Sequence, residues 1–143
     1  MRPNSLAEAV ESIRMGASQD VVLAEFIETF DLAPTNDARY ETIAEEPVLT
    51  NDKRLDAMAG AIAEHLAKQY SLARVPSWAS GTARYLDRPW HTSSPFIDWK
   101  REFLSDAMRE YLTLASPAEF ASRNIFTEER PLRRARGPQP VKT

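Results

Sequence analysis

Apolar residues in the first half of the chain recur at the spacing of amphipathic helices, and no stretch of useful length alternates as a half-buried strand does. Capping residues at the starts and glycine or proline at the ends divide this half into segments. The first helix is predicted to begin at Asn4 or Ser5 and to end at Met15. The second is predicted over residues 19–31, with Ser18 as its cap.

Two further helices are predicted before residue 71. The third is short, over residues 35–46, and a proline ends it. The fourth has the strongest apolar stripe and runs from Thr50 or Asn51 to about Tyr70. Gly60 lies inside this helix, where glycine costs about 1 kcal/mol relative to alanine. We therefore expect another element to contact the helix closely at Gly60.

The regular pattern breaks in residues 74–95, where prolines and a Thr-Ser-Ser run mark turns. Three tryptophans, Trp78, Trp90 and Trp99, lie in or just after this stretch. Tryptophan is costly to expose, and its indole N–H needs a partner when it is buried. We therefore predict a packed loop whose tryptophans lie between the fourth and fifth helices.

A fifth helix is predicted over residues 96–114, and a short sixth helix follows it. Ser116 is predicted as the N-cap of the sixth helix, with Pro117 in its first position and Glu119 completing a capping box. The helix is expected to end near Asn124, a residue type that accepts the left-handed conformation. Residues 125–127 could then be a brief extended piece.

These elements predict an all-α fold, a compact bundle of about five or six helices with a Trp/Pro-rich loop between the fourth and fifth. Residues 1–136 are expected to form a single domain. Residues 137–143 contain two prolines and are expected to be a flexible tail.

Residue types and patterns that the chain lacks exclude several kinds of functional site. Cysteine is absent, so thiolate metal sites and cysteine nucleophiles are excluded. The N-terminal residues show no signal-peptide pattern, and no uncharged run is long enough to cross a membrane. We therefore expect a soluble, cytoplasmic protein without membrane contact.

Candidate catalytic residues are few. His65 lies beside the apolar stripe of the fourth helix and is expected to be a packed or capping histidine. His91 has serines nearby in the sequence, but no glycine-flanked serine elbow supports a nucleophile pair. Metal-ligand patterns, a phosphate-binding loop and a dinucleotide fingerprint are also absent from the sequence. We therefore predict no enzymatic activity, no metal and no cofactor.

The net charge of −3 hides an asymmetry along the chain. Residues 1–50 carry ten acids and three arginines, a net charge of −7, whereas residues 51–100 and 101–143 each carry +2. Acids on amphipathic helices are often only solvated faces, but such a segment could also bind a basic partner. The candidate partner-binding acids are Glu8, Glu11, Glu25, Glu28, Asp31 and Glu41.

The C-terminal segment supports an alternative function. From Arg130 onward there are five bases and no acid, and Arg133 and Arg134 could contact phosphates or a partner protein. A DNA-reading helix would carry basic and amide residues on its exposed face, whereas the helices before residue 50 are acidic. A DNA-binding regulator that uses this segment is thus possible but not favoured.

Arg123 is a further candidate with two interpretations. At the end of a short helix, its charge would complement the helix dipole and bind terminal carbonyl groups. The structural interpretation is the stronger one. In the functional interpretation, Arg123 contacts a partner protein.

Residues 55–136 resemble a family through a set of short segments. They are Val75-Pro76-Ser77-Trp78, Arg84-Tyr85-Leu86-Asp87-Arg88-Pro89-Trp90, Ser116-Pro117 with Phe120, Arg123-Asn124-Ile125-Phe126, and Leu132-Arg133-Arg134-Ala135. In combination they are similar to small bacterial antitoxin-like proteins encoded beside AbiEii-type nucleotidyltransferase toxins. The resemblance implies a partner protein that binds and neutralises such a toxin by direct contact, and it supplies no catalytic residues.

Overall fold

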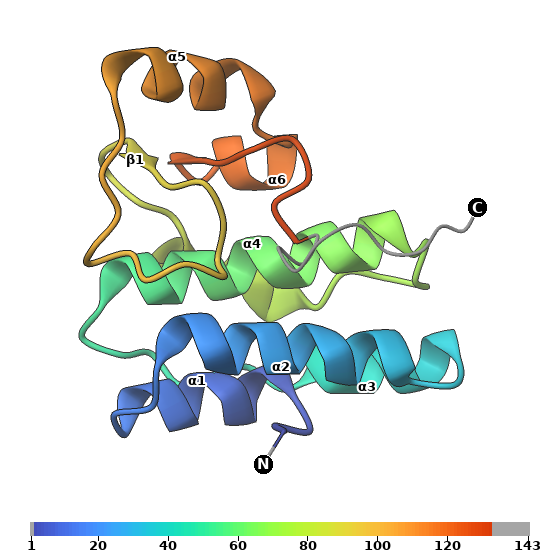
Figure 1. Cartoon of the computed structure of the whole chain (residues 1–143). Coiled ribbons are helices and arrows are strands. Elements are labelled where there is room, and N and C mark those ends of the chain that lie inside the picture. Colours follow the sequence, from blue (N-terminus) through green and yellow to red (C-terminus); the bar gives the residue numbers. More distant parts are fainter. Residues whose placement is uncertain (1, 133–143) are drawn as a thin grey trace.

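The computed structural model of the protein describes residues 2–132, which form six α-helices, two 3-10 turns and one pair of very short strands. The elements lie in three tiers, with α4 (Lys53–Gln69) in the middle (Figure 1). The mostly helical fold class is therefore confirmed. No helix within residues 2–132 combines the length and the apolar character needed to cross a membrane. Arg133, Arg134 and the predicted tail at residues 137–143 lie outside the described residues.

Helices α1 (Leu6–Arg14), α2 (Gln19–Leu32) and α3 (Asn36–Ala44) form the first tier. Their boundaries lie within a turn of the predicted ones, because local capping groups determine where two of them begin. The Ser5 hydroxyl accepts from the backbone N–H of Glu8, and the Thr35 hydroxyl accepts from that of Ala38.

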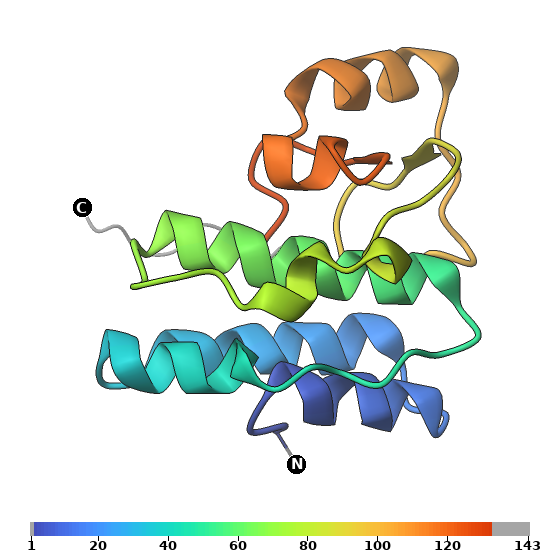
Figure 2. The same ribbon diagram turned by 180° about the vertical axis from the view of Figure 1, so that it is seen from behind.

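Helix α4 (Lys53–Gln69) is the central element, and it begins after the cap Asp52. Residues 55–63 are all buried. A helix that is buried on every side must be covered by several elements. The first tier covers one side, α6 (Ala118–Ala121) packs on another, and the 3-10 turns η1 (Ser77–Ser80) and η2 (Thr82–Arg84) lie along a third (Figure 2).

The predicted extended piece is confirmed as strand β2 (Ile125–Phe126), which pairs in parallel with β1 (Trp90–His91). Trp90 lies opposite Ile125 in the register. Trp90 is buried, its ring meets the Trp99 ring edge-on at 4.8 Å, and Arg54 of α4 lies over it. The pairing thus links the tryptophan-rich loop to the C-terminal segment.

The fifth helix is shorter than predicted. Helix α5 (Asp106–Ala115) begins after the cap Ser105, so residues 96–105 are not part of it. The Glu102 carboxylate accepts from the Thr92 hydroxyl at 2.7 Å and from the Ser93 N–H at 2.9 Å. Because Glu102 binds the preceding loop, residues 96–105 do not continue α5 toward the N-terminus.

The predicted capping box at Ser116 is wrong. Ser116 is the C-cap of α5, and Pro117 is the N-cap of α6 (Ala118–Ala121). The Ser116 hydroxyl donates to the carbonyl of Leu112 at 2.6 Å and accepts from the N–H of Thr127 at 2.8 Å. The serine is therefore used by α5 and by the chain after β2, and it does not cap α6.

Candidate functional site

Arg123 is a structural residue. Its side chain is 0% exposed, and its guanidinium donates to Glu64 Oε1 at 2.6 Å, to the Ala79 carbonyl at 2.6 Å and to the Glu119 carbonyl at 2.8 Å. The following residue, Asn124, has a φ of 66°, as predicted for the end of this helix. Because Arg123 is fully buried, it presents no surface to a partner.

A second buried arginine lies beside the first. Arg84 is 1% exposed and donates to the Pro47 carbonyl at 2.7 Å and to Glu46 Oε2 at 3.2 Å. Both arginines pass Gly60, where an added Cβ would lie 2.9 Å from Arg84 Cβ and 3.1 Å from Arg123 Nε. The close contact expected at Gly60 is confirmed, and the two arginine side chains make it together with the Ala79 carbonyl, which would lie 3.1 Å from the added Cβ.

Ion pairs extend from Arg123 along α4. Burial acts to raise the pKa of Glu64, but hydrogen bonds from Lys68 and Arg123 outweigh it and hold that pKa below its usual value. His65 Nδ1 lies 2.8 Å from Glu119 Oε1, and its ring packs edge-on against Phe120. His65 is a packed histidine, as predicted, and the network joins α4 to α6.

His91 has a structural partner too. Its Nε2 lies 2.8 Å from Thr113 Oγ1, and its ring stacks on Phe126. Burial, together with the charge of Arg109, lowers the pKa of His91. The nearby Ser93 hydroxyl donates to Glu102. Among residues 2–132, no group of three or more acids and histidines could hold a metal ion.

The candidate acids do not form one continuous face. Glu8 accepts from the backbone N–H of Asn4 at 2.9 Å, and Glu11 forms an ion pair with Arg14 at 2.6 Å, so both serve α1 locally. Glu41 extends from α3, which lies behind α2 in Figure 1 and in front of it in Figure 2. Only the acids of α2 are grouped.

Helix α2 carries a stripe of outward residues at helical spacing. Val21, Glu25, Glu28 and Leu32 follow one another along one side of the helix, and Asp31 flanks the stripe. Val21 and Leu32 are exposed, with 53% and 62% of their surface accessible. Glu28 lies 3.7 Å from Arg2 in an exposed ion pair. The stripe thus combines carboxylates with an apolar residue at each end.

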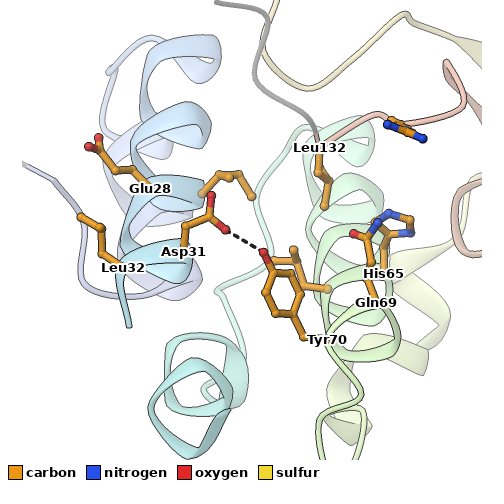
Figure 3. Close-up of a pocket in the computed structure, with 10 residues that line it drawn as sticks. Glu28, Asp31, Leu32, His65, Gln69, Tyr70 and Leu132 are labelled. Atoms are coloured by element: carbon orange, nitrogen blue, oxygen red, sulfur yellow. Dashed lines mark hydrogen bonds between the residues drawn. The ribbon is translucent and has the colours of Figure 1, made fainter. Parts of the chain in front are cut away.

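A groove of about 720 Å³ separates this part of α2 from α4 (Figure 3). The Tyr70 hydroxyl donates to Asp31 Oδ1 at 2.9 Å across the groove, and burial followed by this bond raises the Tyr70 pKa. Leu132 is buried in the core and lines the groove, and Arg130 lies exposed at its rim. The lining residues are Ile27, Glu28, Asp31, Leu32, His65, Leu66, Gln69, Tyr70, Arg130 and Leu132.

Sequence reasoning identified Glu28 and Asp31 but not the residues that face them. Gln69 and Tyr70 come from the end of α4, where a helical pattern gives no sign of a groove. Leu132 lies far along the chain. No local signal in the sequence could have joined these positions, because the groove exists only where α2, α4 and the C-terminal segment meet.

No match was found for this chain among protein-family models, curated proteins or solved structures. The similarity to antitoxin-like proteins therefore stays a prediction.

Proposed function

We propose that this protein binds and neutralises a nucleotidyltransferase-type toxin by direct contact, as its sequence resemblance implies, and that α2 forms the centre of the contact surface. The observation that carries the proposal is the outward stripe of α2. Glu25 and Glu28 lie there between the exposed side chains of Val21 and Leu32. Apolar ends can anchor a partner, and carboxylates between them select a basic one.

The chemistry of the partner supports this surface. A nucleotidyltransferase that acts on RNA must present basic residues to the phosphate backbone and to the incoming triphosphate. An acidic stripe competes for the same residues, so RNA access is blocked without any reaction in the antitoxin. Opposite charges mainly accelerate encounter, and salt screens them. We expect association to slow and binding to weaken as salt is added.

In this proposal the protein blocks the RNA-binding site of the toxin and catalyses no reaction. The side chains that would suggest chemistry have structural partners, since His91 faces Thr113 and His65 faces Glu119. Such a pair of proteins would act in the cytoplasm. The acids of α1 and α3 lie outside the α2 stripe. We propose that they add to the negative electrostatic potential of the first tier and make few direct contacts with the toxin.

The test begins with copurification of the tagged chain from its native host. We expect recovery of a nucleotidyltransferase whose binding weakens at least tenfold in a Glu25→Lys/Glu28→Lys variant, with a smaller salt dependence than for the unchanged chain. Asp87→Lys changes one exposed carboxylate in the same way in the loop before β1, and it should leave binding unchanged.

A truncation separates this proposal from the DNA-binding alternative. Because Leu132 is buried, the cut belongs after it, and removal of residues 133–143 keeps Leu132 in the chain. Toxin binding should survive this cut. Recovery of specific DNA without a protein partner, with loss of that DNA after the cut, would refute neutralisation.

A further inference from the structure

The groove between α2 and α4 combines an oriented carboxylate with an apolar lining (Figure 3). Three of its lining residues, Ile27, Leu66 and Leu132, are buried apolar side chains. Asp31 is exposed on the α2 side, and the Tyr70 hydroxyl donates to its Oδ1 at 2.9 Å. The groove volume of about 720 Å³ is in the range of sites that hold a drug-sized ligand. Such a groove suits a side chain that is apolar along its length and charged at its end.

The groove has free hydrogen-bond acceptors on both of its sides. Within residues 2–132, Asp31 forms no ion pair, and nothing donates to its Oδ2. Because the Tyr70 hydroxyl holds one oxygen, the carboxylate is already oriented, and less freedom is lost when a donor binds the other oxygen. Gln69, on the α4 side, is exposed, and its amide has no hydrogen-bond partner in the same part of the chain.

The charged groups around the groove leave Asp31 available to a cation. Glu28 also lines the groove, but it lies 3.7 Å from Arg2 in an ion pair. Arg130 is exposed at the rim and forms no ion pair with Asp31. The cation that the groove can bind must therefore come from another molecule.

Among side chains, arginine fits this arrangement best. Its guanidinium is planar and carries five N–H donors, so it can serve several acceptors at once. It is also more weakly hydrated than the ammonium group of lysine, so it loses less on entering a groove with an apolar lining. Its methylene groups can lie along that lining.

We propose that the groove receives an arginine side chain of a partner protein, together with an apolar side chain next to it in the partner's sequence. This inference rests on the proposed function, since it names the group of the toxin that the groove binds, an arginine that otherwise contacts RNA. Glu28 and Leu32 belong both to the groove and to the α2 stripe, so the two form one contact surface. The stripe attracts a basic partner, and the groove anchors one of its residues.

A peptide titration tests the groove without the toxin. The probe is acetyl-Leu-Arg-Leu-amide, and its binding to the full chain is followed through the NMR signals of the Gln69 amide. The matched control replaces arginine with citrulline, which has a similar shape but no charge. We expect a Kd of about 1 mM for the arginine peptide and a Kd about tenfold higher or more for the citrulline peptide. Equal binding of the two peptides, or no binding of the arginine peptide up to about 10 mM, would overturn the proposal.

Three variants locate the binding site. Asp31→Asn removes the charge but keeps an oxygen for Tyr70, so it should weaken binding of the arginine peptide about tenfold or more. Arg130→Ala removes a cation from the rim and should strengthen binding about twofold. Asp87→Asn removes an exposed charge from the loop before β1 and should leave the Kd unchanged. A loss in Asp87→Asn as large as that in Asp31→Asn would show that net charge governs binding, which contradicts a site in the groove.

The titration also separates this inference from the proposed function. A toxin recovered by copurification, together with a peptide that does not bind, would leave neutralisation through the α2 stripe and overturn the groove as an arginine site. Peptide binding that Asp31→Asn abolishes, with no toxin recovered, would support the arginine site and refute the toxin as its partner.

Discussion

The two sides of α4 are held in different ways. The first tier packs through apolar side chains such as Leu6, Phe26, Phe30 and Ile43, all 0% exposed. The elements of the second half reach α4 through apolar side chains such as Phe120 and, in addition, through buried charged groups, with Arg84 and Arg123 lying across Gly60. Apolar contact is non-directional, whereas a buried charge requires each of its partners in place. The second side of α4 should therefore tolerate fewer substitutions than the first.

This difference determines what each side tolerates. An apolar layer accepts exchanges that preserve volume, because it has no bond directions to satisfy. Replacing the buried guanidinium of Arg123 removes its hydrogen bonds to Glu64 and to the carbonyls of Ala79 and Glu119, and Lys68 remains as a partner of Glu64. The comparison predicts that changes of similar size have unequal effects on the two sides of α4.

The largest expected effect is that of Arg123→Met. The change keeps much of the side-chain volume but removes all three hydrogen bonds of a fully buried guanidinium and leaves Glu64 with Lys68 alone, so it should cost about 3–5 kcal/mol of unfolding free energy. Urea unfolding followed by circular dichroism measures this cost. A urea midpoint equal to that of the unchanged chain would contradict the comparison. It would show that the polar side of α4 tolerates substitution as well as the apolar side does.

A smaller effect is expected from Glu64→Gln, and it depends on pH. The folded-state pKa of Glu64 is lowered, so its ionised form stabilises the fold above the ordinary glutamate pKa of about 4.3. This contribution is lost as the pH falls through the folded-state value. We expect a cost of about 1–3 kcal/mol at neutral pH.

The difference between Glu64→Gln and the unchanged chain should shrink toward about pH 3, below the ordinary glutamate pKa. Unfolding curves at a series of pH values measure it. A difference that stays constant across that range would show that the charge of Glu64 is not what matters.

Gly60→Ala should destabilise the chain by about 1 kcal/mol. Alanine gains about 1 kcal/mol in helix propensity, but its Cβ would meet Arg84 Cβ at 2.9 Å, and overpacking costs about 1–3 kcal/mol. A thermal melt shows whether the variant is less or more stable than the unchanged chain. A more stable variant would show that the arginines can move away from α4, and thus that their positions on the polar side are not tightly constrained.

The smallest effect is expected on the apolar side. Leu23 of α2 is buried, and Leu23→Met preserves its volume, so the cost should be about 1 kcal/mol or less. It serves as the match to Arg123→Met, measured in the same urea series. A loss as large as that of the arginine variant would remove the contrast between the two sides.

The predictions from sequence succeeded where structure is local. The caps Ser5 and Thr35 bind backbone groups three residues away, so the starts of α1 and α3 could be read from the sequence. The prediction of α5 was wrong at its start because Glu102 binds the loop at Thr92 and Ser93. Helical spacing in residues 96–105 gave no sign of that contact.

The candidate site shows the same division. Glu25, Glu28 and Asp31 could be chosen from charge alone, but Arg123 was a candidate contact residue and proved to be buried. Charge patterns do not distinguish a buried arginine from an exposed one. Its burial depends on Glu64 and Ala79, which are distant in the sequence.

The sequence by itself determined the helices, most of their ends, the acidic character of the first tier and the need for close contact at Gly60. Each follows from interactions within a few residues or from composition. Only the tertiary structure decided that two arginines and the Ala79 carbonyl lie against Gly60, that α2 and α4 enclose a groove, and that nothing in residues 2–132 covers Leu114 of α5. These features depend on which distant segments meet, and burial and hydrogen-bond partners across such contacts are set by the packing of the whole chain.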